Sequence, residues 1–335
     1  MSDPMLARTR ICDLFGITTP ILNAPMGGGD APGELAAAVS RAGGLGMIGG
    51  TTVGDTQWLV EQIRRARDLT DRPFGVGLLS QRPNCERLMH AALDEGVKVI
   101  GHSFADPTPF VAPAHDAGAL VICQVRTLAA AVQAAKAGVD VVTAQGTEAG
   151  GHTGFVSTLA LVPAVVSAVA PVPVVAAGGI GDGRAIAAAL LLGAEGVWIG
   201  TRFLATRESG VSEAHKAAVI GASADDTILT DVFDIDAGTS WPADVSGRAI
   251  RDEFSDQWHA REQELRELVE RDGSQHASSA PGAPTRAFWA GEASGFVTGR
   301  EEAGEVVVNL ARDAAAVLAA RSAALLGRSW AGEQA

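Results

Sequence analysis

Short apolar runs alternate with longer alanine-rich segments through the first 200 residues of the chain. From about residue 20 onward, a segment with helical periodicity ends near a glycine or an acidic residue, and a valine- and isoleucine-rich run follows. The pattern is clearest in SRAGGLGMIGG, DEGVKVIG, HDAGALVICQV, AKAGVDVVTAQG and LLGAEGVWIG. Glycine after a helix supplies a left-handed C-cap, and a continuous apolar run is typical of a buried parallel strand. The alternation therefore predicts βαβ units.

Eight strands can be counted in this pattern. They are expected at residues 21–24, 45–48, 74–78, 97–101, 120–125, 139–144, 172–176 and 196–199. Eight βα units favour an α/β protein with a closed (β/α)8 barrel, the TIM barrel. An open doubly wound sheet remains the alternative, because strand boundaries are loosely determined by sequence.

The alternation stops after Thr201. Residues 206–272 have helical patterns, residues 273–285 form a loop rich in Gly, Pro and Ser, and residues 301–326 form an alanine-rich helix. We therefore predict a ligand-binding barrel of residues 1–205, completed by a closing helix within 300–335. Residues 206–299 are predicted to be a helical substrate cap over one mouth of the barrel, without an independent core.

The net charge of −13 argues against nucleic acid or an anionic membrane as a partner, since proteins that bind them are usually basic. Cys12, Cys85 and Cys123 are widely spaced and contain no CxxC pair, which argues against a disulfide framework or a cysteine metal site. No metal is therefore expected. A small-molecule partner fits better, and a homodimer stays open.

Two further features bear on location. The N-terminal sequence MSDPMLARTR has no apolar h-region, so a signal peptide is not expected. The uncharged run 159–180 is long enough to span a bilayer, but Pro163, Pro171 and Pro173 interrupt it, and it is better explained as helix, turn, strand and glycine loop. A cytoplasmic protein is expected.

In a barrel, the chemistry lies at the C-terminal ends of the strands. The seventh strand is followed by Gly178, Gly179 and Gly181, and the eighth by Gly200 and Thr201. Glycines between a strand and a helix expose backbone N–H groups that bind phosphate, although each could instead be a simple turn residue. A Rossmann site is disfavoured, because GGIGDG has the spacing G-x-G-x-G and follows the seventh strand of a series.

A resemblance to a known family rests on three stretches and the spacing between them. These are APMGGG after the first strand, AQGTEAGGHTG after the sixth, and AAGGIGDGRAIAAALLLGAEGVWIGTRFLAT at the seventh and eighth. Together they resemble the nitronate monooxygenase family, formerly called 2-nitropropane dioxygenase, whose members are FMN-dependent TIM barrels related to flavin-dependent enoyl-ACP reductases. The match is good over residues 15 to about 210 and loose beyond.

The resemblance implies an FMN cofactor and a set of contacts to it. The loops with Gly178, Gly179, Gly181, Gly200 and Thr201 would hold the phosphate. The backbone of Ala24, Pro25 and Met26 would follow the isoalloxazine edge, with Gln145, Gly150 and Gly151 against the flavin. Apart from the resemblance, Gln124 after the fifth strand could face the pocket and bind the cofactor, or it could be a polar residue of the core. Gly77 stands where the family commonly has an asparagine that contacts the flavin, so one side-chain hydrogen bond is missing here.

His152 is the expected catalytic residue, facing the substrate beside the flavin. Imidazole titrates near neutral pH, so it could remove a proton from carbon or hold an anion as a cation. Both tasks suit a nitroalkane or nitronate. Ser103 and His102 could also face the pocket, whereas Glu148 is expected at the loop surface. Trp241, Trp258 and Trp289 are expected to pack the cap.

By resemblance, the reaction is the oxidation of an alkyl nitronate, or of a nitroalkane, by O2 to a carbonyl compound and nitrite. One alternative is an NAD(P)H-dependent flavin reductase acting on an enoyl thioester or a quinone. A second is a flavin-free, phosphate-binding barrel lyase or isomerase. A scaffold without enzymatic activity would leave the glycine loops unexplained.

Overall fold

The computed structural model of the protein describes residues 8–51, 56–273 and 287–325, together with residue 6. The predicted loop 273–285 lies outside these residues from position 274 onward. Among the described residues, no helix is long and apolar enough to cross a membrane.

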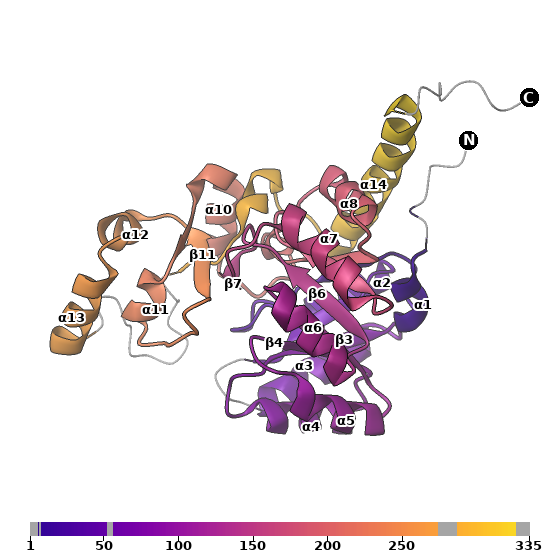
Figure 1. The fold of residues 1–335 in the computed structure, drawn as a ribbon, viewed down its shortest axis with the longest axis horizontal. Coiled ribbons are helices and arrows are strands. Elements are labelled where there is room, and N and C mark those ends of the chain that lie inside the picture. The colour runs from indigo at the N-terminus through magenta and orange to yellow at the C-terminus, as the bar shows by residue number, and fades with distance from the viewer. Residues whose placement is uncertain (1–5, 7, 52–55, 274–286, 326–335) are drawn as a thin grey trace, which may run out of the picture.

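Eight parallel strands form the central sheet, which confirms the TIM-barrel prediction (Figure 1). In sheet order they run β1, β9, β8, β6, β5, β4, β3, β2, and a parallel bridge between Leu22 and Leu45 joins the two outer strands. Their bounds are β1 Ile21–Asn23, β2 Gly46–Gly49, β3 Phe74–Leu79, β4 Val99–Ser103, β5 Leu120–Val125, β6 Val141–Gln145, β8 Val174–Ala177 and β9 Gly196–Ile199.

Helices cover the outside of this barrel. They are α2 Gly33–Arg41, α3 Thr56–Leu69, α4 Cys85–Asp94, α5 Thr108–Asp116, α6 Leu128–Ala137, α7 Thr158–Val169 and α8 Gly183–Leu191. The five glycines of the repeated sequence pattern adopt positive φ angles between 69° and 95°, as a left-handed turn before a strand requires; they are Gly43, Gly96, Gly118, Gly138 and Gly193. The run 159–180 contains α7, β8 and the start of a glycine loop.

The eighth helical position is filled from a distant part of the chain. After β9 only the four-residue helix α9 (Thr201–Leu204) follows, and the long helix α14 (Ala303–Leu325) packs against α8 and α2. The predicted closing helix therefore completes the outer layer. At the other end of the barrel, α1 (Arg10–Phe15) places Ile11, Cys12 and Phe15 against the interior core.

The insertion between α9 and α14 is mainly helical, as predicted, and also contains two short strands that the sequence pattern did not indicate. Its elements are α10 Glu213–Gly221, η1 Ala224–Asp226, β10 Thr227–Thr230, α11 Val232–Asp236, β11 Ser246–Ile250, α12 Glu253–Trp258, α13 Glu262–Asp272 and η2 Glu292–Phe296. Strand β11 pairs antiparallel with β10 and with β7 (Gly151–Thr153), which lies inside the EAGGHTG motif. The motif is thus the segment through which the barrel pairs with the insertion.

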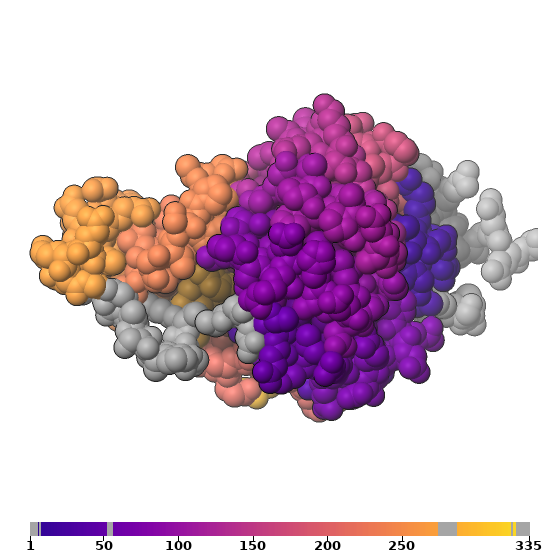
Figure 2. All heavy atoms as spheres, turned by 90° about the horizontal axis from the view of Figure 1, so that it is seen from below, coloured from indigo at the N-terminus to yellow at the C-terminus, as the bar shows by residue number. Residues whose placement is uncertain are grey.

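The insertion also has a small core of its own, contrary to the prediction. Val232, Phe233, Phe254 and Leu265 are buried together, with Trp258 packed against them. Figure 1 shows α11, α12 and α13 to one side of the barrel, with β7 and β11 between. In Figure 2 the orange residues of the insertion form a lobe beside the barrel.

Candidate active site

A cavity of about 380 Å³ lies at the C-terminal ends of the barrel strands. This size falls within the range of roughly 300–1,000 Å³ that is usual for cofactor and ligand pockets. Its wall includes residues at or just after the ends of all eight barrel strands, and residues of the insertion. The predicted site residues that line it are Ala24, Pro25, Met26, Gly77, Gln124, Gln145, Gly150, Gly151, His152, Gly178, Gly179, Gly200 and Thr201.

Gly181 is the predicted residue that the structure does not bring to the cavity wall. A Cβ atom at Gly181 would lie 2.5 Å from Cδ2 of Phe296, so this glycine makes room for an aromatic side chain of the insertion. We therefore no longer assign it a phosphate contact.

The glycine loops after β8 and β9 lie together at one end of the cavity. Helix α8 is already capped there, because the Asp182 side chain accepts a hydrogen bond from the Ala185 N–H at 2.9 Å. An anion at this end would therefore use the backbone of Gly179 and Gly200 rather than the first turn of α8. Thr201 Oγ1 accepts a hydrogen bond from the Gly291 N–H at 2.8 Å and keeps its own hydrogen to donate.

Gly150 and Gly151 of EAGGHTG are glycines for different structural reasons. A Cβ at Gly150 would lie 2.4 Å from the backbone N of Gly291, so Gly150 allows the barrel loop and the insertion to meet backbone to backbone. Gly151 has a φ of +68° and no heavy atom within 4 Å of its Cβ position. It is Gly151, therefore, that leaves open space beside the cavity.

The neighbouring Pro25 explains why residue 77 is a glycine and not the asparagine that the family resemblance led us to expect. A Cβ at this position would lie 2.2 Å from Cγ of Pro25, so the Pro25 ring fills the space that a side chain from β3 would need. The two positions are complementary: a glycine on β3 lets a proline of the β1 loop form part of the cavity wall.

Alanine at Gly77 should therefore destabilise the protein by about 1–3 kcal/mol, the usual cost of overpacking, and displace Pro25. The thermal unfolding midpoint of the apoprotein is the measurement. Gly221→Ala on α10 is the matched control, because no heavy atom lies within 4 Å of the Cβ position there. A Gly77→Ala midpoint equal to that of the wild type would contradict the packing argument.

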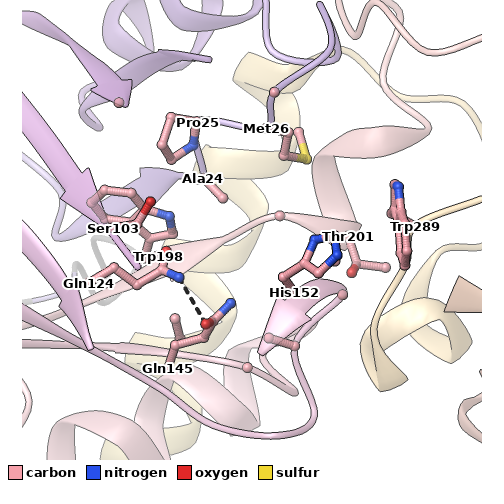
Figure 3. A pocket seen from close by; sticks show the side chains of 18 of the residues that line it. Ala24, Pro25, Met26, Ser103, Gln124, Gln145, His152, Trp198, Thr201 and Trp289 are labelled. Carbon is pink, nitrogen blue, oxygen red and sulfur yellow. Dashed lines mark hydrogen bonds between the residues drawn. The ribbon is translucent and has the colours of Figure 1, made fainter. Parts of the chain in front are cut away.

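Polar side chains lie at the other end of the cavity (Figure 3). Gln124 Nε2 donates a hydrogen bond to Gln145 Oε1 at 2.8 Å. Trp198, which is 4% exposed, lines the cavity from β9, and its indole N–H is buried without a hydrogen-bond partner.

His152 stands between two indole rings of the insertion. Its imidazole stacks on Trp241 at 3.7 Å between centroids with an interplanar angle of 16°, and lies 4.9 Å from Trp289. Trp289 fits there because Gly247, paired with His152 across β7 and β11, has no side chain: a Cβ would lie 2.3 Å from the indole. Trp289 also packs against the core of the insertion, as expected, and Trp241 and Trp289 both line the cavity.

Asp234 of α11 completes this arrangement. His152 Nε2 lies 2.9 Å from Asp234 Oδ2, and the two side chains are only 14% and 13% exposed. The other carboxylate oxygen, Oδ1, accepts hydrogen bonds from Thr239 Oγ1 at 2.9 Å and from Trp241 Nε1 at 3.1 Å. A histidine with its second nitrogen on a carboxylate has the arrangement of an oriented acid–base group.

Of the remaining polar residues, some line the cavity and others lie in the structure behind it. Ser103 lines the cavity and donates to the Leu78 carbonyl at 3.2 Å. His102 does not line it: Nδ1 lies 2.9 Å from Ser80 Oγ, and burial lowers the pKa of the imidazole to about 4. Glu148, expected at the loop surface, is half-buried and lines the cavity, and its carboxylate accepts hydrogen bonds from the N–H and hydroxyl of Thr158.

Asp30 is a second carboxyl group in the cavity wall, after β1. Burial raises its pKa from 3.8 to about 6. A raised folded-state pKa means that the folded protein binds this proton more tightly than the unfolded chain, so stability decreases as the pH rises from about 4 to 6.

Asparagine at Asp30 should therefore make the apoprotein more stable than the wild type at pH 7, by at most about 3 kcal/mol. The advantage should shrink as the pH falls through 6 towards 4, because the carboxyl of the folded wild type takes up its proton over this range. Urea unfolding of both proteins at pH 4, 5, 6 and 7 measures this difference. Parallel stability curves would mean that Asp30 is not desolvated in the folded protein.

Sequence patterns missed Asp234, Asp30 and Trp198. Asp234 lies 82 residues from His152 in a segment without a recognisable motif, so no local signal could have paired the two. Trp198 was visible as an inward-facing position of a predicted strand, and the strand alternation could have placed it in the barrel interior.

Comparison with known proteins agrees with this geometry. The family model described as nitronate monooxygenase matches residues 8–88 and 84–310. A curated relative from Mycobacterium tuberculosis, (3aS,4S,5R,7aS)-5-hydroxy-7a-methyl-1-oxo-octahydro-1H-indene-4-carboxyl-CoA dehydrogenase, is 38% identical over 232 residues. The match covers 69% of this chain and 65% of that protein, slightly less than two thirds of its length.

Two solved structures resemble the whole described fold. FabK from Thermotoga maritima superposes with a TM-score of 0.81 at 32% identity, covering 96% of this chain and 99% of that one. A nitroalkane oxidase from Streptomyces ansochromogenes has a TM-score of 0.76 at 30% identity, with coverage of 94% and 99%.

Proposed function

The chain belongs to the nitronate monooxygenase family, and from this membership we propose that it is an FMN-dependent oxidoreductase. The proposed reaction converts an alkyl nitronate, or the nitroalkane from which it forms, with O2 into a carbonyl compound and nitrite. The nitroalkane oxidase of similar structure supports this substrate class.

Several features of the cavity support FMN as the cofactor. Gly179, Gly200 and Thr201 would hold the phosphate through backbone N–H groups and one hydroxyl. The side chains of Gln124 and Gln145 supply donors and acceptors for a flat polar ring system. Bound FMN would supply the electron transfer between substrate and O2, and the protein would supply position and charge.

The observation that carries the proposal is His152 in the cavity wall, held by Asp234 and stacked on Trp241. Its imidazole can take the proton from the carbon next to a nitro group, or hold the resulting anion as imidazolium. The two indoles of Trp241 and Trp289 give the substrate side an apolar wall, which suits the alkyl part of a nitroalkane.

A dehydrogenase or flavin reductase acting on an acyl or enoyl thioester is the second candidate. The relative that is named a carboxyl-CoA dehydrogenase supports it. Two guanidinium groups also lie at the aromatic side of the cavity: Arg82 is 5.6 Å from the centre of the Trp241 ring, and Arg126 is 5.3 Å from that of Phe104. Such groups could bind the phosphates of a CoA tail.

Anaerobic mixing separates the candidates. The holoenzyme would be mixed separately with a preformed nitronate, with NADH and with a saturated acyl-CoA, while the flavin absorbance is recorded. We expect rapid bleaching with the nitronate. Bleaching by NADH or acyl-CoA alone would favour the second candidate, and a colourless protein that binds no FMN would favour a flavin-free lyase or isomerase.

The cell compartment is part of the proposal. Cys12, Cys85 and Cys123 are free and buried, which suits a reducing environment, so we place the enzyme in the cytoplasm.

A further inference from the structure

The two oxygens of Asp234 have different hydrogen-bond partners. Oδ2 faces His152 Nε2 at 2.9 Å, whereas Oδ1 accepts from the Thr239 hydroxyl and the Trp241 indole. An indole N–H can only donate and an ionised carboxylate can only accept. The carboxylate is therefore fixed in one orientation, and Nε2 must be the ring nitrogen that carries the hydrogen.

The second ring nitrogen of His152, Nδ1, has a different environment. In the part of the chain that the structure describes, no hydrogen-bond partner of Nδ1 is found, and it is not among the fully buried polar atoms without a partner. The imidazole lines the cavity, and stacking on Trp241 fixes its plane. Nδ1 is thus the nitrogen that a molecule in the cavity can reach.

We propose that Asp234 is the positioning residue that holds His152 in the tautomer with hydrogen on Nε2, so that Nδ1 is the base that deprotonates a neutral nitroalkane. This inference rests on the proposed function for its substrate. In the step, the C–H bond next to the nitro group breaks and its electron pair moves into that group, giving the nitronate. The proton passes to Nδ1, and Asp234 balances the charge of the imidazolium.

The carboxylate geometry makes Asp234→Asn a sharp test. Thr239 and Trp241 both donate to the Oδ1 position, so the amide of the variant must place its oxygen there and turn its NH2 towards His152. Nε2 must then accept, and the hydrogen moves to Nδ1. The variant keeps the shape of the site while it protonates the nitrogen that faces the substrate.

The expected kinetic result is selective. For Asp234→Asn, kcat/KM on a neutral nitroalkane should fall by roughly 10²- to 10⁴-fold, the usual contribution of a positioned acid–base group. Oxidation of the preformed nitronate should change by less than about tenfold, since no C–H bond must break. Asp231→Asn, the same change at the start of α11, is the matched control and should act like the wild type.

Nitrogen-15 NMR of the holoenzyme tests the tautomer independently of catalysis. The chain has seven histidines, so His152 is assigned by comparison with His152→Gln. Wild type should show hydrogen on Nε2 and Asp234→Asn hydrogen on Nδ1. Hydrogen on Nδ1 in the wild type overturns the proposal even if the variant does not fold.

The two hypotheses fail in different ways. Suppose that Asp234→Asn has the altered tautomer but still turns over the nitroalkane within about threefold of the wild-type rate. Nδ1 of His152 would then not be the base. If wild type oxidises neither the nitroalkane nor the nitronate, the proposed function fails. In that case, the expected change of tautomer in Asp234→Asn would still show that Asp234 positions His152.

Discussion

Aspartate in place of Gly179 should yield a colourless protein without FMN. Gly179 lies in the cavity wall with Gly200 and Thr201, at the end that we assign to the phosphate. A carboxylate there would repel a phosphate of the same charge. We expect the flavin content after purification, read from the absorbance spectrum, to fall from near one FMN per chain to near zero.

A control is needed to separate the effect of the added charge at position 179 from the effect of the added side-chain volume. Gly179 has a φ of +69°, and its Cβ position is 3.2 Å from Cβ of Glu148, so any side chain adds strain. Gly179→Asn is the matched control, because asparagine has nearly the same size and tolerates the left-handed conformation without a charge. The control should keep most of its FMN. A yellow, fully loaded Gly179→Asp protein would disprove the phosphate placement.

Alanine in place of His152 should reduce turnover of neutral nitroalkanes by roughly 10²- to 10⁴-fold, because it removes the group that accepts the proton. Flavin content should stay near normal, since the backbone of Gly150 and Gly151 is unchanged. Asp234 keeps its two donors, Thr239 and Trp241, so the local structure should tolerate the change. Steady-state rates with a nitroalkane and with its preformed nitronate are the measurement.

The second substrate shows which task His152 performs. If it is a base, nitronate oxidation should largely survive in His152→Ala. If it instead holds the anion as imidazolium, nitronate oxidation should fall as well. His90→Ala, at an exposed position on α4, is the control. Wild-type rates on both substrates in a loaded His152→Ala protein would remove His152 from the mechanism.

The barrel and its strand-end loops could be predicted because they depend on local patterns. A valine-rich run after a glycine-capped helix has few structural solutions, and all five glycines of that pattern adopt the expected positive φ. The C-terminal ends of parallel strands must meet at one face, so Gln145, His152 and Gly179 could be expected at one cavity before any contact was known. The end of the alternating helix–strand pattern after Thr201 could also be recognised in the sequence.

The surroundings of His152 were decided by tertiary structure. The EAGGHTG segment becomes strand β7 only because β11, about 95 residues later, pairs with it, and that pairing brings Trp289 beside the imidazole across Gly247. Asp234 reaches His152 from a helix packed in the core of the insertion. Periodicity and glycine conformation act over a few residues, whereas the register between distant segments depends on which surfaces fit together. The sequence by itself therefore determined the barrel and the histidine, and only the packing of the insertion determined which groups orient that histidine.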